Sequence, residues 1–217
     1  MFRPSFRPEM WLLMLLMVAA IPAVGCQSVM FTVAYLWNGT DEPPEFEGLK
    51  DKKVAVVCRP VPSLQYSNAN AGRDLAANVS ELLKLKVPKI KTVDQRKICK
   101  WADENRWEEY KEVGRAVKAE VIVGIELESF SLYQAQTLYQ GKADARIEVY
   151  DCKTGKQLLE KTIHSVYPPN TAVYTSDMTE PEFRKKYLLV LADQIGRYFY
   201  AHDAHAELGL DSTALDK

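Results

Sequence analysis

Between residues 119 and 166 the chain has the pattern of an antiparallel β-meander, and this restricts the fold more than any other feature. Residues 119–132 are rich in β-branched and aromatic side chains, and residues 143–150 alternate apolar odd positions with mostly charged even ones. Such alternation is typical of a strand with one face on the core and one in water. The turn at 151–156 has glycine where a positive φ is needed, and residues 158–166 return as a third strand.

The first of these strands also predicts an irregularity. Its apolar positions keep one parity from Val121 to Leu127 and change it at Phe130 and Leu132. An extra residue in one strand produces such a change. We therefore expect a β-bulge near Ser129.

Other elements flank the meander, and their ends carry helix-capping residues or prolines. A fully apolar run before Pro60 is typical of a strand covered on both faces. Thr179 and Glu182 have capping-box spacing, with Pro181 in the first turn of the helix that follows. The expected elements are a strand at 53–58, a helix from the N-cap Asn70 to Lys86, a strand at 89–93, a short helix capped by Asp94, a helix over 107–117, and a final helix to about Tyr200.

The predicted order is β-α-β-α-α-β-β-β-α. It indicates an α/β fold with a single mixed sheet, made of two short N-terminal strands and a three-strand antiparallel meander. Helices pack on this sheet, and the longest is the C-terminal one. We place this domain at 53–201, followed by a polar tail at 202–217.

The N-terminus has the pattern of an export signal. Two arginines precede an apolar core at 10–20, and Pro22 and small residues lead to Cys26. The tetrapeptide at 23–26 resembles the lipobox of bacterial lipoproteins. The resemblance implies a signal peptide at 1–25 that is removed and acyl chains on Cys26, and Gln27 after it favours the outer membrane. Residues 26–52 then form a lipid-anchored apolar segment and an acidic, proline-containing tether.

An uncleaved membrane anchor is the alternative. The sequence stays largely apolar from Met10 to Trp37, which is long enough to span about 30 Å of hydrocarbon. A third possibility is that residues 29–37 pack on the domain or lie among the lipid headgroups. Both main alternatives place residues 38–217 outside the cytoplasm.

Composition excludes some functions. The chain has 28 Lys and Arg against 29 Asp and Glu, a net charge of −1, which gives no reason to expect nucleic acid as a partner. Three of the four cysteines follow Cys26, and an odd number does not make a disulfide framework. We expect Cys58, which follows an apolar strand, to be a small buried hydrophobic residue.

Four short motifs carry a family resemblance: Lys53–Val57, Thr92–Arg96, Val113–Gly124 and the turn Asp151–Gly155. They resemble motifs of a group of bacterial envelope domains. The group comprises the N-terminal domain of TolB, the lipoprotein activator of penicillin-binding proteins and the lipoprotein of the curli secretion channel. The resemblance implies a non-enzymatic accessory, adaptor or assembly protein of the envelope with no cofactor, which binds another envelope protein or further copies of itself.

We expect most of the aromatic residues to lie in the core or at its edge, and two or three of them to anchor a partner from an exposed patch. Tyrosine and tryptophan are enriched at the energetic centres of protein interfaces. The segments 133–141 and 166–178 carry tyrosines and are long enough to be functional loops. The candidate anchors are Tyr133, Tyr139, Tyr167 and Tyr174.

Catalytic and metal chemistry has weaker support. His202 and His205 have a spacing that could bind a metal, but they lie in the predicted tail, so we expect no metal site. Glu126, Glu128 and Glu148 could form a carboxylate pair on the meander, the basis of a rival hypothesis of a glycan-acting hydrolase. Their even numbers place them on the polar face, so we expect a solvated or partner-binding surface instead.

Overall fold

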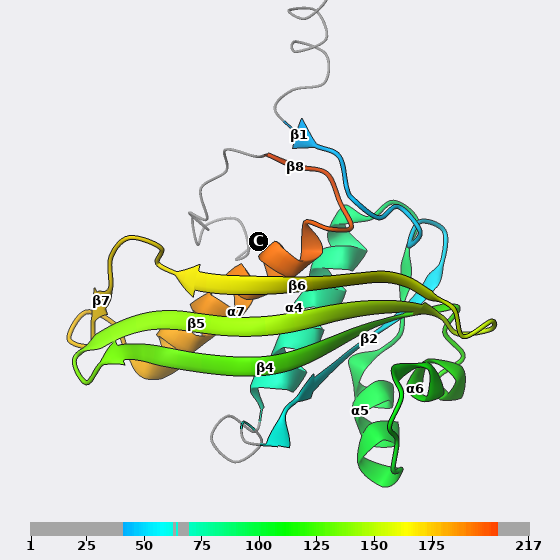
Figure 1. The fold of residues 1–217 in the computed structure, drawn as a ribbon, viewed down its shortest axis with the longest axis horizontal. Helices are drawn as coiled ribbons and strands as arrows, with labels where there is room; N and C mark the ends of the chain where they lie inside the picture. The colour runs from blue at the N-terminus through cyan, green and yellow to red at the C-terminus, as the bar shows by residue number, and fades with distance from the viewer. Residues whose placement is uncertain (1–40, 63, 65–69, 204–217) are drawn as a thin grey trace, which may run out of the picture. The chain divides into compact units, whose positions relative to one another are not determined.

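The computed structural model describes residues 41–62, 64 and 70–203 (Figure 1). The chain divides into two compact units, and of the first (1–41 and 203–205) only Asp41 and Asp203 are described. The following account concerns the second unit. The lipidation predicted at Cys26, the rival span and residues 204–217 of the predicted tail lie outside the described residues. No helix in the described part is both long and apolar enough to cross a membrane.

The elements follow the predicted order, with three added two-residue strands. They are β1 (Asp41–Glu42), β2 (Lys53–Pro60), α4 (Ala71–Lys86), β3 (Lys91–Thr92), α5 (Gln95–Glu104), α6 (Tyr110–Ala116), β4 (Val121–Ala135), β5 (Leu138–Asp151), β6 (Gln157–Tyr167), β7 (Val173–Tyr174), α7 (Glu180–Gly196) and β8 (His202–Asp203).

One mixed sheet organises the second unit, in the strand order β3-β2-β4-β5-β6. β2 runs parallel to β3 and β4, whereas β4, β5 and β6 form the antiparallel meander. β7 adds to the sheet beside the start of β5. The pairing of β4 with β5 shifts register between Leu127 and Ser129. The predicted fold class and the predicted bulge are therefore confirmed.

Helices α4 and α7 cover one face of the sheet (Figure 1). The carboxylate of Glu182 accepts a hydrogen bond of 3.0 Å from the backbone N–H of Thr179, so the capping box starts α7 as predicted. Asn70 occupies the N-cap position of α4 without a side-chain hydrogen bond. Their shared core includes Leu75, Val79, Phe183, Tyr187, Leu191 and Ile195.

Helices α5 and α6 cover the other face over β2, β4 and the end of β5 at Tyr150. A second core joins Ala55 and Val57 of β2 to Ile98 of α5 and Val113 of α6. β2 is therefore buried on both faces, as its apolar run predicts. On β5 the even residues from Asp144 to Glu148 are only partly buried, and they belong to an open face that the cores of the described helices do not reach.

Four predicted boundaries were wrong. The final helix, expected to run to about Tyr200, ends at Gly196. The helix expected over 107–117 begins at Tyr110. The loop expected at 133–141 is almost entirely strand, because β4 and β5 continue to a turn at 136–137. The tether was expected to extend to residue 52, but its last residues belong to the domain. Leu49 is fully buried, and the ring of Phe46 packs edge-on against Phe199. Apolar side chains inside this acidic segment attach it to the core.

Candidate functional site

Two of the four candidate tyrosines belong to the core. Tyr139 and Tyr167 are only 5% and 8% exposed. The ring of Tyr139 stacks on Phe183 with 5.0 Å between centroids, and the ring of Tyr167 stacks on Tyr187 at 6.5 Å. The expectation that these two residues are exposed anchors is therefore wrong. Extension of the β4–β5 hairpin places Tyr139 over α7, where its ring joins an aromatic stack.

The other two candidates are exposed, at 42% for Tyr133 and 62% for Tyr174. Strand register places them on opposite faces of the sheet. Tyr133 lies opposite Tyr139, and the two rings are 5.1 Å apart, whereas Tyr174 lies opposite Leu138, the next residue of β5. Successive side chains of a strand point to opposite faces. Tyr133 is bound to α7 through its hydroxyl, which donates to Glu180 and whose pKa this hydrogen bond raises.

The carboxylates of the meander are held by arginines on the open face. Arg146 Nη2 lies 3.0 Å from Glu126 Oε2 and 2.9 Å from Glu128 Oε1. Arg59 approaches Glu126 to 3.6 Å from the neighbouring strand. Charge interaction with Glu126 raises the pKa of Arg146, although partial burial opposes this. Two of the three carboxylates of the hydrolase hypothesis, Glu126 and Glu128, therefore have a guanidinium between them. The third, Glu148, accepts a 3.2 Å hydrogen bond from the Tyr150 hydroxyl.

A second polar cluster lies where the β-bulge occurs. Ser129 Oγ donates a 2.6 Å hydrogen bond to Asp144, and His164 Nδ1 lies 2.6 Å from the other oxygen of the same carboxylate. These contacts lower the pKa of Asp144. In a catalytic triad the histidine lies between serine and carboxylate. Here the carboxylate lies between them, so nothing in the cluster can take the proton of Ser129 in the way a triad histidine does.

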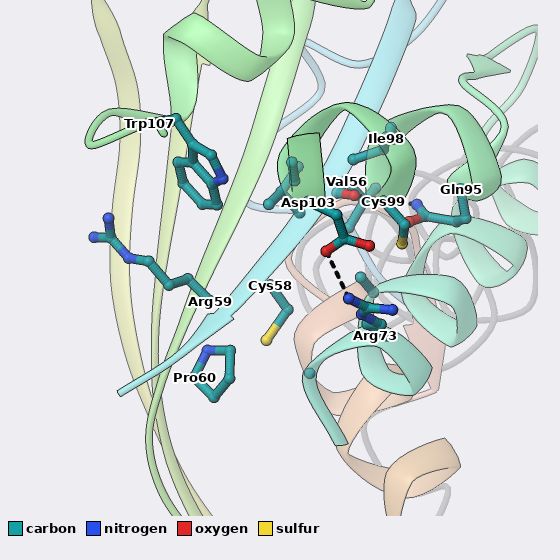
Figure 2. Close-up of a pocket in the computed structure, with 14 residues that line it drawn as sticks. Val56, Cys58, Arg59, Pro60, Arg73, Gln95, Ile98, Cys99, Asp103 and Trp107 are labelled. Carbon is teal, nitrogen blue, oxygen red and sulfur yellow. Dashed lines mark hydrogen bonds and ion pairs between the residues drawn. The ribbon is translucent and has the colours of Figure 1, made fainter. Parts of the chain in front are cut away.

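A groove of about 500 Å³ runs between α4 and α5 beside the edge of β2 (Figure 2). Arg73 of α4 reaches Asp103 of α5 with 2.6 Å between charged atoms. β3 pairs only with Lys53 and Val54 of β2. The carbonyl of Val56, further along β2, instead accepts a hydrogen bond from Gln95 Nε2. Most polar groups at this groove therefore already have partners within the fold.

Trp107 and Arg59 close one end of the groove (Figure 2). The Arg59 guanidinium lies 5.3 Å from the ring centre of Trp107 and 5.2 Å from that of Tyr110. It also donates a 2.8 Å hydrogen bond to the carbonyl of Glu108. Sequence reasoning missed this arrangement because Arg59 comes from β2 and the other residues from 107–110, at the start of α6, and no local pattern connects the two segments.

Cys58 lines the same groove, and burial raises the pKa of its thiol to about 12. Cys58 is half-buried, so it is less deeply buried than we predicted from the sequence. Burial and the charge of Asp151 likewise raise the pKa of Cys152, to about 11. In the described part of the chain Cys58, Cys99 and Cys152 are all free thiols. No group of three or more His, Cys, Asp or Glu side chains there could hold a metal ion.

Comparison with known proteins gives distant similarities of structure. No family model matches the chain, and no curated protein matches it. The structure is similar to the PelC dodecamer from Paraburkholderia phytofirmans, with 11% identity, a TM-score of 0.47, and coverage of 74% of this chain and 95% of that one. It is similar to lipoprotein GNA1162 from Neisseria meningitidis (9% identity, TM-score 0.41, coverage 66% and 96%). It is also similar to the LpoB C-terminal domain from Salmonella enterica (10% identity, TM-score 0.30, coverage 54% and 85%).

Proposed function

We propose that this chain is a non-catalytic accessory, adaptor or assembly lipoprotein of the bacterial envelope. In this proposal acyl chains on Cys26 hold it at a membrane, the outer membrane being favoured by Gln27. Its α/β domain lies outside the cytoplasm and binds another envelope protein. The anchor rests on the lipobox resemblance alone, and the binding role rests on the surface of the domain.

The observation that carries the binding role is the contrast between Arg146 and Tyr174. Arg146 lies between Glu126 and Glu128, so these acidic groups neutralise a neighbour of their own chain. A general acid or base needs its proton to be transferable to a substrate. Tyr174, by contrast, exposes most of its ring at the end of the sheet. A large aromatic side chain in this position favours protein contact over catalysis.

Site-specific photocrosslinking in cells tests this role. A photoreactive amino acid replaces Tyr174 in the full-length chain, and a matched chain carries it at Leu85, which is 74% exposed on α4. We expect a discrete protein adduct at position 174 and none of the same mass at position 85. Identical adduct patterns, or none at 174, would contradict the proposal. A glycan-acting hydrolase would instead lose turnover of a glycan substrate in Glu126→Gln.

A further inference from the structure

The edge strand β6 is the most regular exposed strand of the sheet. The strand order ends at β6, so no described strand pairs with its outer side. Its register with β5 is regular from Leu159 to Tyr167, and a shift of one residue places Leu158 in a bulge before that stretch. An edge strand presents unpaired backbone groups that can pair with another chain.

The alternation of hydrogen bonds shows which backbone groups of β6 face outward. Asp151 at the end of β5 donates to the carbonyl of Lys156, next to β6, and the neighbouring Cys152 donates to Glu120, next to β4. In an antiparallel sheet, alternate residues bond to the strands on either side. Odd residues of β5 therefore bond to β6, and their partners in β6 are also odd. From Glu160 to Val166, the N–H and C=O groups of the even residues of β6 therefore point away from the sheet.

The side chains of the even residues from Glu160 to Val166 lie on the open face, opposite even residues of β5, and Leu158 is exposed in the bulge that precedes them. Leu158 is 37% exposed and Val166 is 41% exposed, and both belong to the few large apolar side chains exposed on the described surface. Between them lie Glu160, Thr162 and His164. The pattern of these five residues is therefore symmetric about Thr162. Glu160 and His164 flank the threonine, and an apolar residue lies at each end.

We propose that β6 pairs with β6 of a second copy of this chain, antiparallel and about a two-fold axis at Thr162. In that register Thr162 lies opposite itself, Glu160 lies opposite His164 of the second copy, and the bulge residue Leu158 comes next to its Val166. A two-fold interface must be self-complementary in this way. The register pairs apolar with apolar and acid with histidine, and it uses the backbone groups that point outward.

Lys161 does not oppose this pairing. A charged residue on the inner face of an edge strand commonly prevents association. Here the ammonium of Lys161 forms an ion pair with Glu45 and lies 5.7 Å from the ring centre of Tyr198, both in the same chain. These partners hold the charge beneath the sheet and away from the edge. The pairing is independent of the surface around Tyr174 that carries the proposed function.

Thiol crosslinking of the full-length chain in its membrane tests the proposal. Thr162→Cys places two thiols across the axis, within reach of a short bismaleimide, whereas Leu85→Cys places equally accessible thiols on α4. The wild-type chain reports any crosslinking through the native cysteines. We expect a covalent dimer in Thr162→Cys, with a peptide linked through position 162 of both copies, and no such dimer in the other two chains. A monofunctional maleimide verifies that the thiol at position 162 is accessible. The proposal would be overturned if this accessible thiol gave no dimer, or if Leu85→Cys gave as much dimer as Thr162→Cys.

Glu160→Pro in the Thr162→Cys chain tests the backbone pairing, and Glu160→Ala is its matched control. The N–H of residue 160 points outward, so proline removes one inter-chain bond from each copy, two per dimer, and none of the β5–β6 ladder. We expect the dimer fraction to fall about tenfold with proline and less than about twofold with alanine. Circular dichroism verifies the fold, and Glu160→Lys, which faces His164 of the second copy without altering the backbone, is a second test expected to reduce the dimer. An unchanged dimer fraction in the folded proline variant, or in Glu160→Lys, would overturn the proposal.

Discussion

Tyr200 donates a 2.7 Å hydrogen bond to Asp193, and both residues are buried. Asp193 also lies 3.0 Å from Arg197 and 3.3 Å from Lys86. Burial alone would raise the pKa of Asp193, but the hydrogen bonds from Tyr200 and Arg197 and the charge of Lys86 hold it below its usual value. This carboxylate joins the end of α7 to α4 and to the segment after α7.

The first prediction concerns acid stability. A carboxylate with a lowered folded pKa stabilises the fold fully above its unfolded pKa, and this contribution is lost as pH falls through the folded pKa. We expect Asp193→Asn to reduce the free energy of unfolding by about 1–3 kcal/mol at pH 7, and the difference from wild type to shrink below about pH 4. Urea unfolding at several pH values measures both effects. Asp103→Asn, in an exposed pair with Arg73, is the control and should cost about 0–1 kcal/mol. A loss in Asp193→Asn that is constant between pH 7 and pH 3 would contradict the linkage.

The second prediction separates the tyrosines by their depth. Tyr139→Ala removes a ring from the stack on Phe183 and should destabilise the fold by about 3–5 kcal/mol. Tyr174→Ala changes an exposed side chain and should stay within about 0.5 kcal/mol of wild type. Thermal or urea unfolding of both variants measures the difference. Equal losses would mean that Tyr174 belongs to the core and is not a free anchor.

The third prediction concerns Cys58. A thiol with a pKa of about 12 has roughly 1,000-fold less thiolate at pH 8 than a thiol with the ordinary value of 9.0. We therefore expect iodoacetamide at pH 8 to leave Cys58 unmodified in the folded protein over times that fully modify it in urea. Peptide mass analysis of the alkylated chain reads each cysteine separately. Rapid modification of Cys58 without urea would show that the groove opens to bulk solvent.

Local patterns in the sequence predicted most of the fold. The alternation at 143–150, the capping box at Thr179 and the parity change near Ser129 each have a cause within a few residues, and each is confirmed. The segment 133–141 has no such alternation, so the hairpin extension was missed. Its strand character comes from Tyr139 packing on Phe183 of α7, a contact between residues distant in the sequence.

The same limit explains the candidate site. Aromatic content at 133–174 identified residues able to anchor a partner, but burial depends on the partner strand and on the helix beneath. Arg146 between Glu126 and Glu128 follows from the register of β4 with β5. That register also depends on the turn at 136–137, and the loop expected at 133–141 left the position of this turn open.

The last prediction concerns the anchor. If Cys26 is the lipid-bearing N-terminus, the membrane-extracted chain lacks residues 1–25 and carries acyl chains, because the thiol must be modified before the signal is cut. Cys26→Ser removes the acyl acceptor and should yield a longer, unacylated chain. Intact mass spectrometry of both proteins measures this, and Cys99→Ser is the matched control, since its thiol lies in α5 and should not affect processing. A full-length, unacylated mass in both wild type and Cys26→Ser would make residues 10–37 a membrane span. The domain would then keep its place outside the cytoplasm, but the lipoprotein part of the proposed function would fail.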